Sequence, residues 1–117
     1  MPVPRAQRVR RTADFDAVRQ KGASWNGVLL IIAVLPLNGE TSSRFGFTVT
    51  RRFGNAVVRN KVRRRLAAIV ASQSALIIRP HLIVTIPRPA AGNASFDSLK
   101  AEWIKLARRA GLLPKAP

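Results

Sequence analysis

The sequence predicts one domain of the α/β (α+β) class, with a small mixed sheet of three to four strands and about three helices in the order αββ(β)αβα. Its 117 residues suffice for one modest hydrophobic core. The spacing of its apolar residues changes several times between helical and strand-like periods. Hydrophobic residues make up 47% of the chain, which argues against global disorder despite a high charge.

The folded domain is expected to span residues 12–111. Residues 1–11 hold two prolines and four arginines and are interpreted as a flexible basic arm, and residues 112–117 as a short tail. Thr12 can cap a first helix, in which Phe15 and Val18 form an apolar stripe. Gly22 is a natural end for this helix.

Two strands are predicted next. Trp25 to Leu35 is apolar on both faces and rich in β-branched residues, and a turn signal follows at residues 36–39. Arg44 to Thr50 then alternates. Phe45, Phe47 and Val49 are expected on one face, and Arg44, Gly46, Thr48 and Thr50 on the other. The two segments predict a β-hairpin.

A long helix is predicted from Ala56 to Ala71, because apolar residues recur there at spacings of three and four. Its apolar stripe consists of Val58, Val62, Leu66, Ile69 and Val70. His81 to Ile86 is predicted as a further strand, ended by Pro87. Ser95 is expected to cap a last helix that Gly111 closes.

The composition favours a polyanionic partner. The net charge is +16, from 21 basic and 5 acidic residues. Such an excess indicates nucleic acid rather than acidic membrane, because no basic amphipathic helix stands apart from the core. Without cysteine there is no disulfide or thiolate chemistry, and a zinc finger is disfavoured. The chain starts with polar and basic residues, and its longest apolar run, Val28 to Leu35, is too short to span a membrane. We therefore expect a cytoplasmic protein.

Seven basic residues fall within residues 51–65 and form the basic cluster: Arg51, Arg52, Arg59, Lys61, Arg63, Arg64 and Arg65. A charged helix face is often merely solvated, but no carboxylate lies between Glu40 and Asp97 to neutralise this one. Gly54 would allow a sugar-phosphate backbone to approach closely. Asn55 would cap the helix, whose unpaired first amides can cradle phosphate. The cluster predicts a rigid surface for phosphate.

Other residues admit a structural and a functional interpretation. Phe15, Phe45 and Phe47 are more often core residues than platforms for stacked bases, and Phe15 is the best candidate for stacking. His81, the only histidine, begins an apolar strand and is interpreted as structural. The five acidic residues show no spacing typical of a two-metal nuclease site.

Residues Arg44 to Leu66 resemble the signature of the bacterial ribonuclease P protein subunit. The specific part is the turn Gly54-Asn55-Ala56-Val57, followed by Arg59-Asn60-Lys61 and Arg63-Arg64. Arg8 to Phe15 is similar to the family's opening, and the resemblance spans about residues 5–111. It implies a compact two-layer sandwich in which the basic helix lies in a left-handed strand–helix–strand crossover, against the usual right-handed rule.

The resemblance also implies a partner and a substrate. The partner is the catalytic RNA of ribonuclease P, the substrate is precursor tRNA with a 5′ leader, and the RNA performs Mg²⁺-dependent hydrolysis. No cofactor is expected on the protein alone, and neither a membrane nor an obligate protein partner is expected. The residues implied to bind the RNA subunit are Arg51, Arg52, Gly54, Asn55, Arg59, Asn60, Lys61, Arg63, Arg64 and Arg65. Those implied to form a leader cleft are Arg10, Arg11, Phe15, Arg19, Thr48 and Thr50.

Two positions depart from the family pattern. Lys61 stands where the motif usually has arginine, which keeps the charge but loses the two-point fork. Arg19 stands where relatives often place a second aromatic residue, which suggests a more electrostatic grip on the leader. The same features would also suit a non-catalytic ribosomal or other structured-RNA protein, or a nucleoid-type DNA binder.

Overall fold

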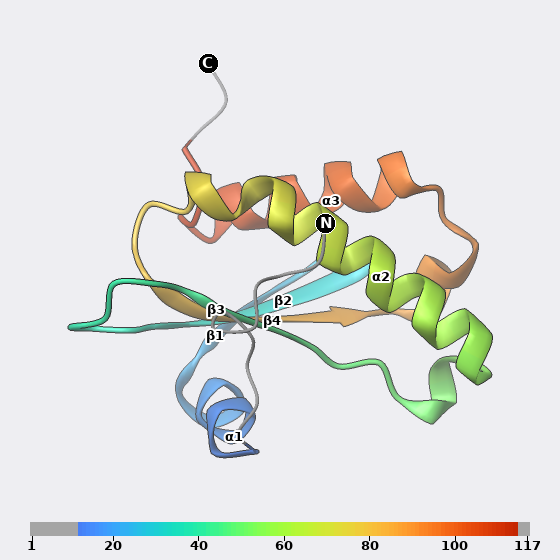
Figure 1. Ribbon diagram of the computed structural model, residues 1–117, viewed down its shortest axis with the longest axis horizontal. Coiled ribbons are helices and arrows are strands. Elements are labelled where there is room, and N and C mark those ends of the chain that lie inside the picture. Colours follow the sequence, from blue (N-terminus) through green and yellow to red (C-terminus); the bar gives the residue numbers. More distant parts are fainter. Residues whose placement is uncertain (1–11, 115–117) are drawn as a thin grey trace.

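The computed structural model describes residues 12–114 and confirms the α+β class (Figure 1). The elements are α1 (Thr12–Lys21), β1 (Ala23–Asn26), β2 (Leu30–Pro36), β3 (Arg44–Phe47), α2 (Ala56–Gln73), β4 (His81–Pro87) and α3 (Phe96–Arg109). Short 3-10 helices η2 (Arg51–Phe53), η3 (Ser74–Leu76) and η4 (Pro89–Asn93) connect them. Helices α2 and α3 form a layer on one face of the sheet, and α1 lies on the other face. The predicted basic arm lies outside the described residues.

The sheet has the strand order β1-β2-β4-β3. The predicted hairpin between residues 25–35 and 44–50 is wrong, because β4 lies between β2 and β3. β2 pairs antiparallel with β1 and β4, whereas β3 pairs parallel with β4. The hairpin lies inside the predicted first strand, where Trp25 of β1 pairs with Ile32 of β2. α2 connects the parallel strands β3 and β4, and the left-handed sense of that crossover stays a prediction.

The turn between β1 and β2 is held by a side chain from α3. The Glu102 carboxylate accepts hydrogen bonds from the backbone amides of Val28 (3.1 Å), Leu29 (2.7 Å) and Leu30 (2.6 Å). A Cβ atom at Gly27 would lie 2.6 Å from Cδ of Glu102, so only glycine lets the turn approach α3 this closely. The turn therefore depends on a residue more than 70 positions later in the chain.

The main core fills the space between the sheet and the α2–α3 layer. Its largest fully buried side chains include Trp103, Phe45, Leu30, Ile32 and Leu66. Nε1 of Trp103 donates to Oγ1 of Thr85 (3.0 Å), so the one polar atom of the indole is satisfied inside the core. Leu112 and Leu113 are also buried in this core, so the domain runs at least two residues beyond the predicted boundary at residue 111.

A smaller second core lies on the α1 side of the sheet. Val18 of α1 is buried against Leu82 and Val84 of β4. α1 ends at Lys21 as predicted, and a Cβ atom at Gly22 would lie 2.5 Å from the carbonyl oxygen of Val18. Because this core is small, α1 covers only part of its face of the sheet (Figure 1).

Candidate nucleic-acid interface

The entry to α2 has the predicted turn and cap. Gly54 has φ 156°, a backbone conformation that other residues rarely adopt. Oδ1 of Asn55 accepts a hydrogen bond from the amide of Val58 (3.0 Å), which confirms Asn55 as the N-cap. The helix itself offers no partner to the amides of Ala56 and Val57, so these donors and the positive end of the helix dipole face outward.

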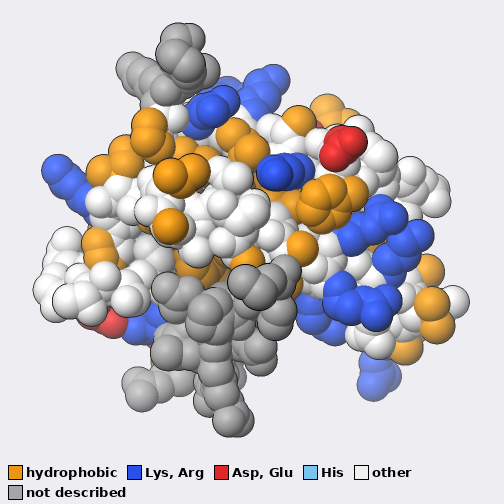
Figure 2. All heavy atoms as spheres, turned by 45° about the horizontal axis from the view of Figure 1, so that its top comes forward, with side chains coloured by type: hydrophobic (Ala, Val, Ile, Leu, Met, Phe, Trp, Pro, Cys, Tyr) orange, Lys and Arg blue, Asp and Glu red, His pale blue; other side chains and the backbone are white. Residues whose placement is uncertain are grey.

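The basic cluster lies on the exposed side of this helix. Val62, Leu66, Ile69 and Val70 are buried, as the spacing predicts. The residues on the opposite side are exposed: Asn60, Lys61, Arg63 and Arg64. Arg51 and Arg52 are exposed on η2, just before α2, and Arg59 is half-buried at the margin of the stripe. Figure 2 shows lysine and arginine side chains gathered at the right of the molecule, over the N-terminal part of α2. The helix therefore presents a dense positive surface on a rigid support.

Arg65 differs from the rest of the basic cluster. Its Nη1 donates to the carbonyl oxygen of Ala94 (3.0 Å), in the connection between η4 and α3. Arg63 donates to Oδ1 of Asn60 (3.2 Å) and stays exposed. Within residues 12–114, no cation of the basic cluster lies within ion-pair distance of a carboxylate. The cluster thus keeps its charge available to a partner, while Arg65 also ties α2 to α3.

Two adjoining cavities form a groove between α1 and η2, on the α1 face of the sheet. The first, of about 130 Å³, is lined by Phe15, Val18, Arg19, Ala33, Thr48, Val84 and Ile86. The second, of about 210 Å³, is lined by Thr48, Thr50, Arg52, Phe53, Ile86, Pro87 and Pro89. Thr48 and Ile86 border both cavities, so the two lie side by side, and together they are called the α1 groove.

The α1 groove brings together four of the six residues predicted for a leader cleft: Phe15, Arg19, Thr48 and Thr50. Arg10 and Arg11 lie outside the described residues. Sequence reasoning missed Phe53, which lines the far end beside Arg52. The place of Phe53 beside Thr48 and Thr50 depends on the path of the chain after β3, which local sequence does not show. The groove therefore has an aromatic ring and an arginine at each end.

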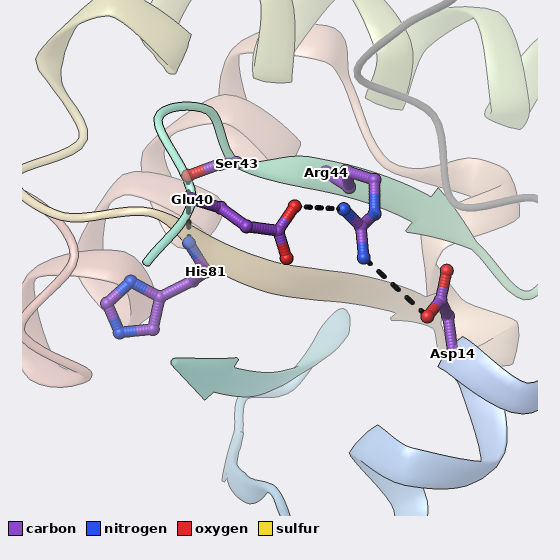
Figure 3. Close-up of polar contacts among 5 residues, drawn as sticks. All are labelled: Asp14, Glu40, Ser43, Arg44 and His81. Atoms are coloured by element: carbon purple, nitrogen blue, oxygen red, sulfur yellow. Dashed lines mark hydrogen bonds and ion pairs between the residues drawn. The ribbon is translucent and has the colours of Figure 1, made fainter. Parts of the chain in front are cut away.

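Four of the five acidic side chains make structural contacts, and that of Glu102 is described above. Arg44 of β3 lies between two carboxylates, with Nη2 3.7 Å from Oδ1 of Asp14 and Nη1 donating to Oε1 of Glu40 (Figure 3). Asp16 pairs with Arg19 at 3.5 Å on the surface of α1. Within residues 12–114, no group of three or more histidine, cysteine, aspartate or glutamate residues could hold a metal ion.

His81 has the structural role that the sequence predicts. Its backbone amide donates to Oγ of Ser43 (3.0 Å), which fixes the start of β4 to the segment before β3 (Figure 3). Nδ1 lies 2.7 Å from the carbonyl oxygen of Arg79, so the ring is held against the segment just before β4.

None of the helices in the described part of the chain is both long enough and apolar enough to cross a membrane.

Comparison with known proteins points to one family. The family model described as "Ribonuclease P" matches residues 3–111. The ribonuclease P protein component of Acidothermus cellulolyticus is 39% identical over 108 residues, 92% of this chain and 90% of that protein. That of Syntrophomonas wolfei is 32% identical over 108 residues, with the same shares of the two chains. The structure of the RNase P protein from Thermotoga maritima superimposes with a TM-score of 0.79 at 28% identity, covering 87% of this chain and 96% of the other.

Proposed function

Because this chain belongs to the ribonuclease P protein family, we propose that its two positive surfaces bind two different RNAs. As the protein subunit of a ribonucleoprotein endoribonuclease, the chain works with the RNA subunit in processing the 5′ leader of tRNA. In our proposal, the basic cluster docks on the RNA subunit. The α1 groove holds the single-stranded leader of the precursor tRNA.

The basic cluster suits a folded RNA because its charges are carried on an ordered helix. Arg63 and Arg64 project from a helix whose opposite side is anchored by Val62 and Leu66 in the main core. A backbone that is already ordered loses less entropy on binding than a disordered segment does. Each phosphate that the cluster neutralises releases counterions, so the affinity should fall steeply with salt.

The α1 groove suits a single strand because it combines aromatic rings, hydroxyls and cations. This combination, in two adjoining cavities, is the observation that carries the proposal. Phe15 and Phe53 offer rings at the two ends, and Thr48 and Thr50 offer hydroxyls between them. Single-stranded RNA is commonly held by bases stacked on aromatic faces along a basic channel. Arg52 borders the groove and belongs to the basic cluster, so a bound leader would run toward the RNA subunit.

We further propose that Mg²⁺ and the hydrolytic chemistry belong to the RNA subunit. Four of the five acids of this chain support the proposal because they are committed elsewhere: Asp14, Asp16 and Glu40 to arginines, and Glu102 to backbone amides. The protein would contribute charge that screens the repulsion between two RNAs. That screening would favour occupancy of Mg²⁺ at the RNA's active site.

Reconstitution tests this function. Added to ribonuclease P RNA at low Mg²⁺, the protein should raise the rate of cleavage of leader-bearing precursor tRNA. Absence of stimulation would refute the proposal. Cleavage by the protein alone, in preparations free of RNA, would refute the assignment of the chemistry to RNA.

Phe15→Leu tests the groove itself. Leucine keeps the apolar bulk that packs against the second core but removes the face on which a base can stack. Loss of one stacked base should lower the affinity for leader-bearing precursor tRNA by about fivefold or more, and spare mature tRNA. Phe96→Leu is the matched control, because Phe96 is 37% exposed on α3, on the opposite side of the sheet. Equal losses of affinity for both RNAs would show that Phe15 acts only by packing against the second core.

A further inference from the structure

α1 carries one wall of the groove but is held to the sheet by few apolar contacts. Val18 is the one buried side chain among those described in α1. The second core holds two more buried residues, Leu82 and Val84, and the residues packed against it are only partly buried: Phe15, Ala33, Leu35, Leu37 and Ile86. At its C-terminal end, α1 is fixed because Gly22 leaves no room between it and β2. At its N-terminal end, the contact from the side chain of Asp14 goes to Arg44 of β3 (Figure 3).

The direction of the Arg44 side chain is set from two sides. Glu40, in the connection between β2 and β3, accepts from Nη1, while Nη2 faces Asp14 (Figure 3). Arg44 pairs with Leu82 in the register of β3 and β4, so it lies on the strand face that carries the second core. Because Glu40 holds Nη1 of Arg44, the position of Nη2 is restricted. Asp14 forms the ion pair only when its carboxylate lies at that position.

Partial burial makes this ion pair more effective than others on the same helix. The side chains of Arg44 and Asp14 are 27% and 20% exposed, whereas those of Arg19 and Asp16 are 77% and 46% exposed. Solvent and salt therefore screen the Arg44–Asp14 pair less than the Arg19–Asp16 pair. Asp14 directly precedes Phe15 in the chain. Phe15 of α1 lines the same cavity as Thr48 and Ile86.

We infer that Arg44 is a positioning residue, which with Asp14 and Glu40 sets the distance between α1 and the sheet and hence the width of the groove. The inference rests on the proposed function of the groove as the leader site. Arg44 does not line either cavity and acts through the placement of α1. Its effect is on discrimination between RNAs with and without a leader, while docking of the RNA subunit is unaffected.

The experiment compares Asp14→Asn with Asp97→Asn in the reconstituted holoenzyme. Both changes remove one negative charge from the first turn of a helix and raise the net charge by one, so general electrostatic effects on RNA binding are matched. Asp97 is exposed on α3, across the sheet from the groove. The quantity measured is the ratio of affinities for leader-bearing precursor tRNA and mature tRNA, at a temperature where both variants are folded.

Asp97→Asn should keep the wild-type ratio. Asp14→Asn should lower it about two- to fivefold, the factor that a partly exposed ion pair commonly contributes. Arg44→Lys should lower the ratio as well, because an ammonium group cannot bridge two carboxylates as the planar guanidinium does. This variant serves as the test if Asp14→Asn does not fold. Asp14→Glu, which keeps the charge, should restore most of the ratio.

A wild-type ratio in Asp14→Asn, or in Arg44→Lys if that variant alone folds, would overturn the inference and leave the leader site intact. A wild-type protein that does not discriminate between the two RNAs would overturn the leader site and, with it, this inference.

Discussion

Replacing Arg64 or Arg65 by methionine should separate two roles of adjacent arginines in the basic cluster. Arg64 is exposed and makes no side-chain hydrogen bond or ion pair to another residue in 12–114. Arg65 is half-buried and donates to the carbonyl oxygen of Ala94. Methionine keeps an unbranched stem and a similar helix propensity while removing the charge and the donors.

The expected losses of stability follow from these contacts. A hydrogen bond from a charged donor contributes about 1.5–3 kcal/mol, and the partial exposure of this one places Arg65→Met at about 1–2 kcal/mol. For a domain of this size, that loss lowers Tm by about 4–8 °C. Arg64→Met leaves an exposed position and should stay within about 0.5 kcal/mol of the wild type.

The expected order for RNA binding is the reverse. Loss of one phosphate contact at Arg64 should flatten the slope of log affinity against log salt by about 0.7–0.9. Arg65→Met should change the slope less, because its guanidinium already has a partner in the fold. Thermal unfolding by circular dichroism and a salt titration of binding to ribonuclease P RNA measure the two quantities. Equal Tm values and equal slopes for the two variants would refute the division of roles.

Two further predictions concern the fold. Glu102→Gln should destabilise the protein by about 1–3 kcal/mol in urea unfolding, because glutamine replaces one of the two acceptor oxygens by an NH2 donor and leaves at least one turn amide without an acceptor; an unchanged midpoint would show that the turn is stable without the carboxylate. Thr85→Val should cost about 1–3 kcal/mol by leaving Nε1 of Trp103 unsatisfied in the core. Thr85→Ser keeps the hydroxyl and should cost less, and equal losses for the two variants would refute the role of this hydrogen bond.

Helix ends were predictable because their signals are local. Asn55 and Ser95 cap α2 and α3 through bonds to amides three residues on, and sequence spacing shows such pairs directly. Gly111, with φ 78°, follows the end of α3 as predicted. α2 runs two residues past its predicted end, to Gln73.

Strand pairing was not predictable in the same way. The run from Trp25 to Leu35 is apolar throughout, and the turn that divides it is stabilised by Glu102, far along the chain. The turn signal at residues 36–39 suggested a hairpin, yet β4 takes the central place because it is apolar on both faces. Local sequence did not reveal which strand lies beside β2.

The residues of the candidate site were also predictable only in part. Alternation in residues 44–50 and the family resemblance placed Phe15, Arg19, Thr48 and Thr50 together, and the cavities contain all four. Phe53 and the ion pair of Arg44 with Asp14 were missed, because each depends on segments that meet only in the folded chain.

The strand order also constrains how a nascent chain can complete this fold. Both strands of the β1–β2 hairpin have been synthesised by residue 36, but Glu102, which holds their turn, comes much later, and β3 has no strand to pair with until β4 is available. β4, one of the two inner strands, is the last strand to be synthesised, after the most positively charged helix in residues 12–114. The sheet is therefore completed only when β4 pairs with β2 and β3, which is a long-range step. Before that step, the cations of α2 belong to a chain with an incomplete sheet.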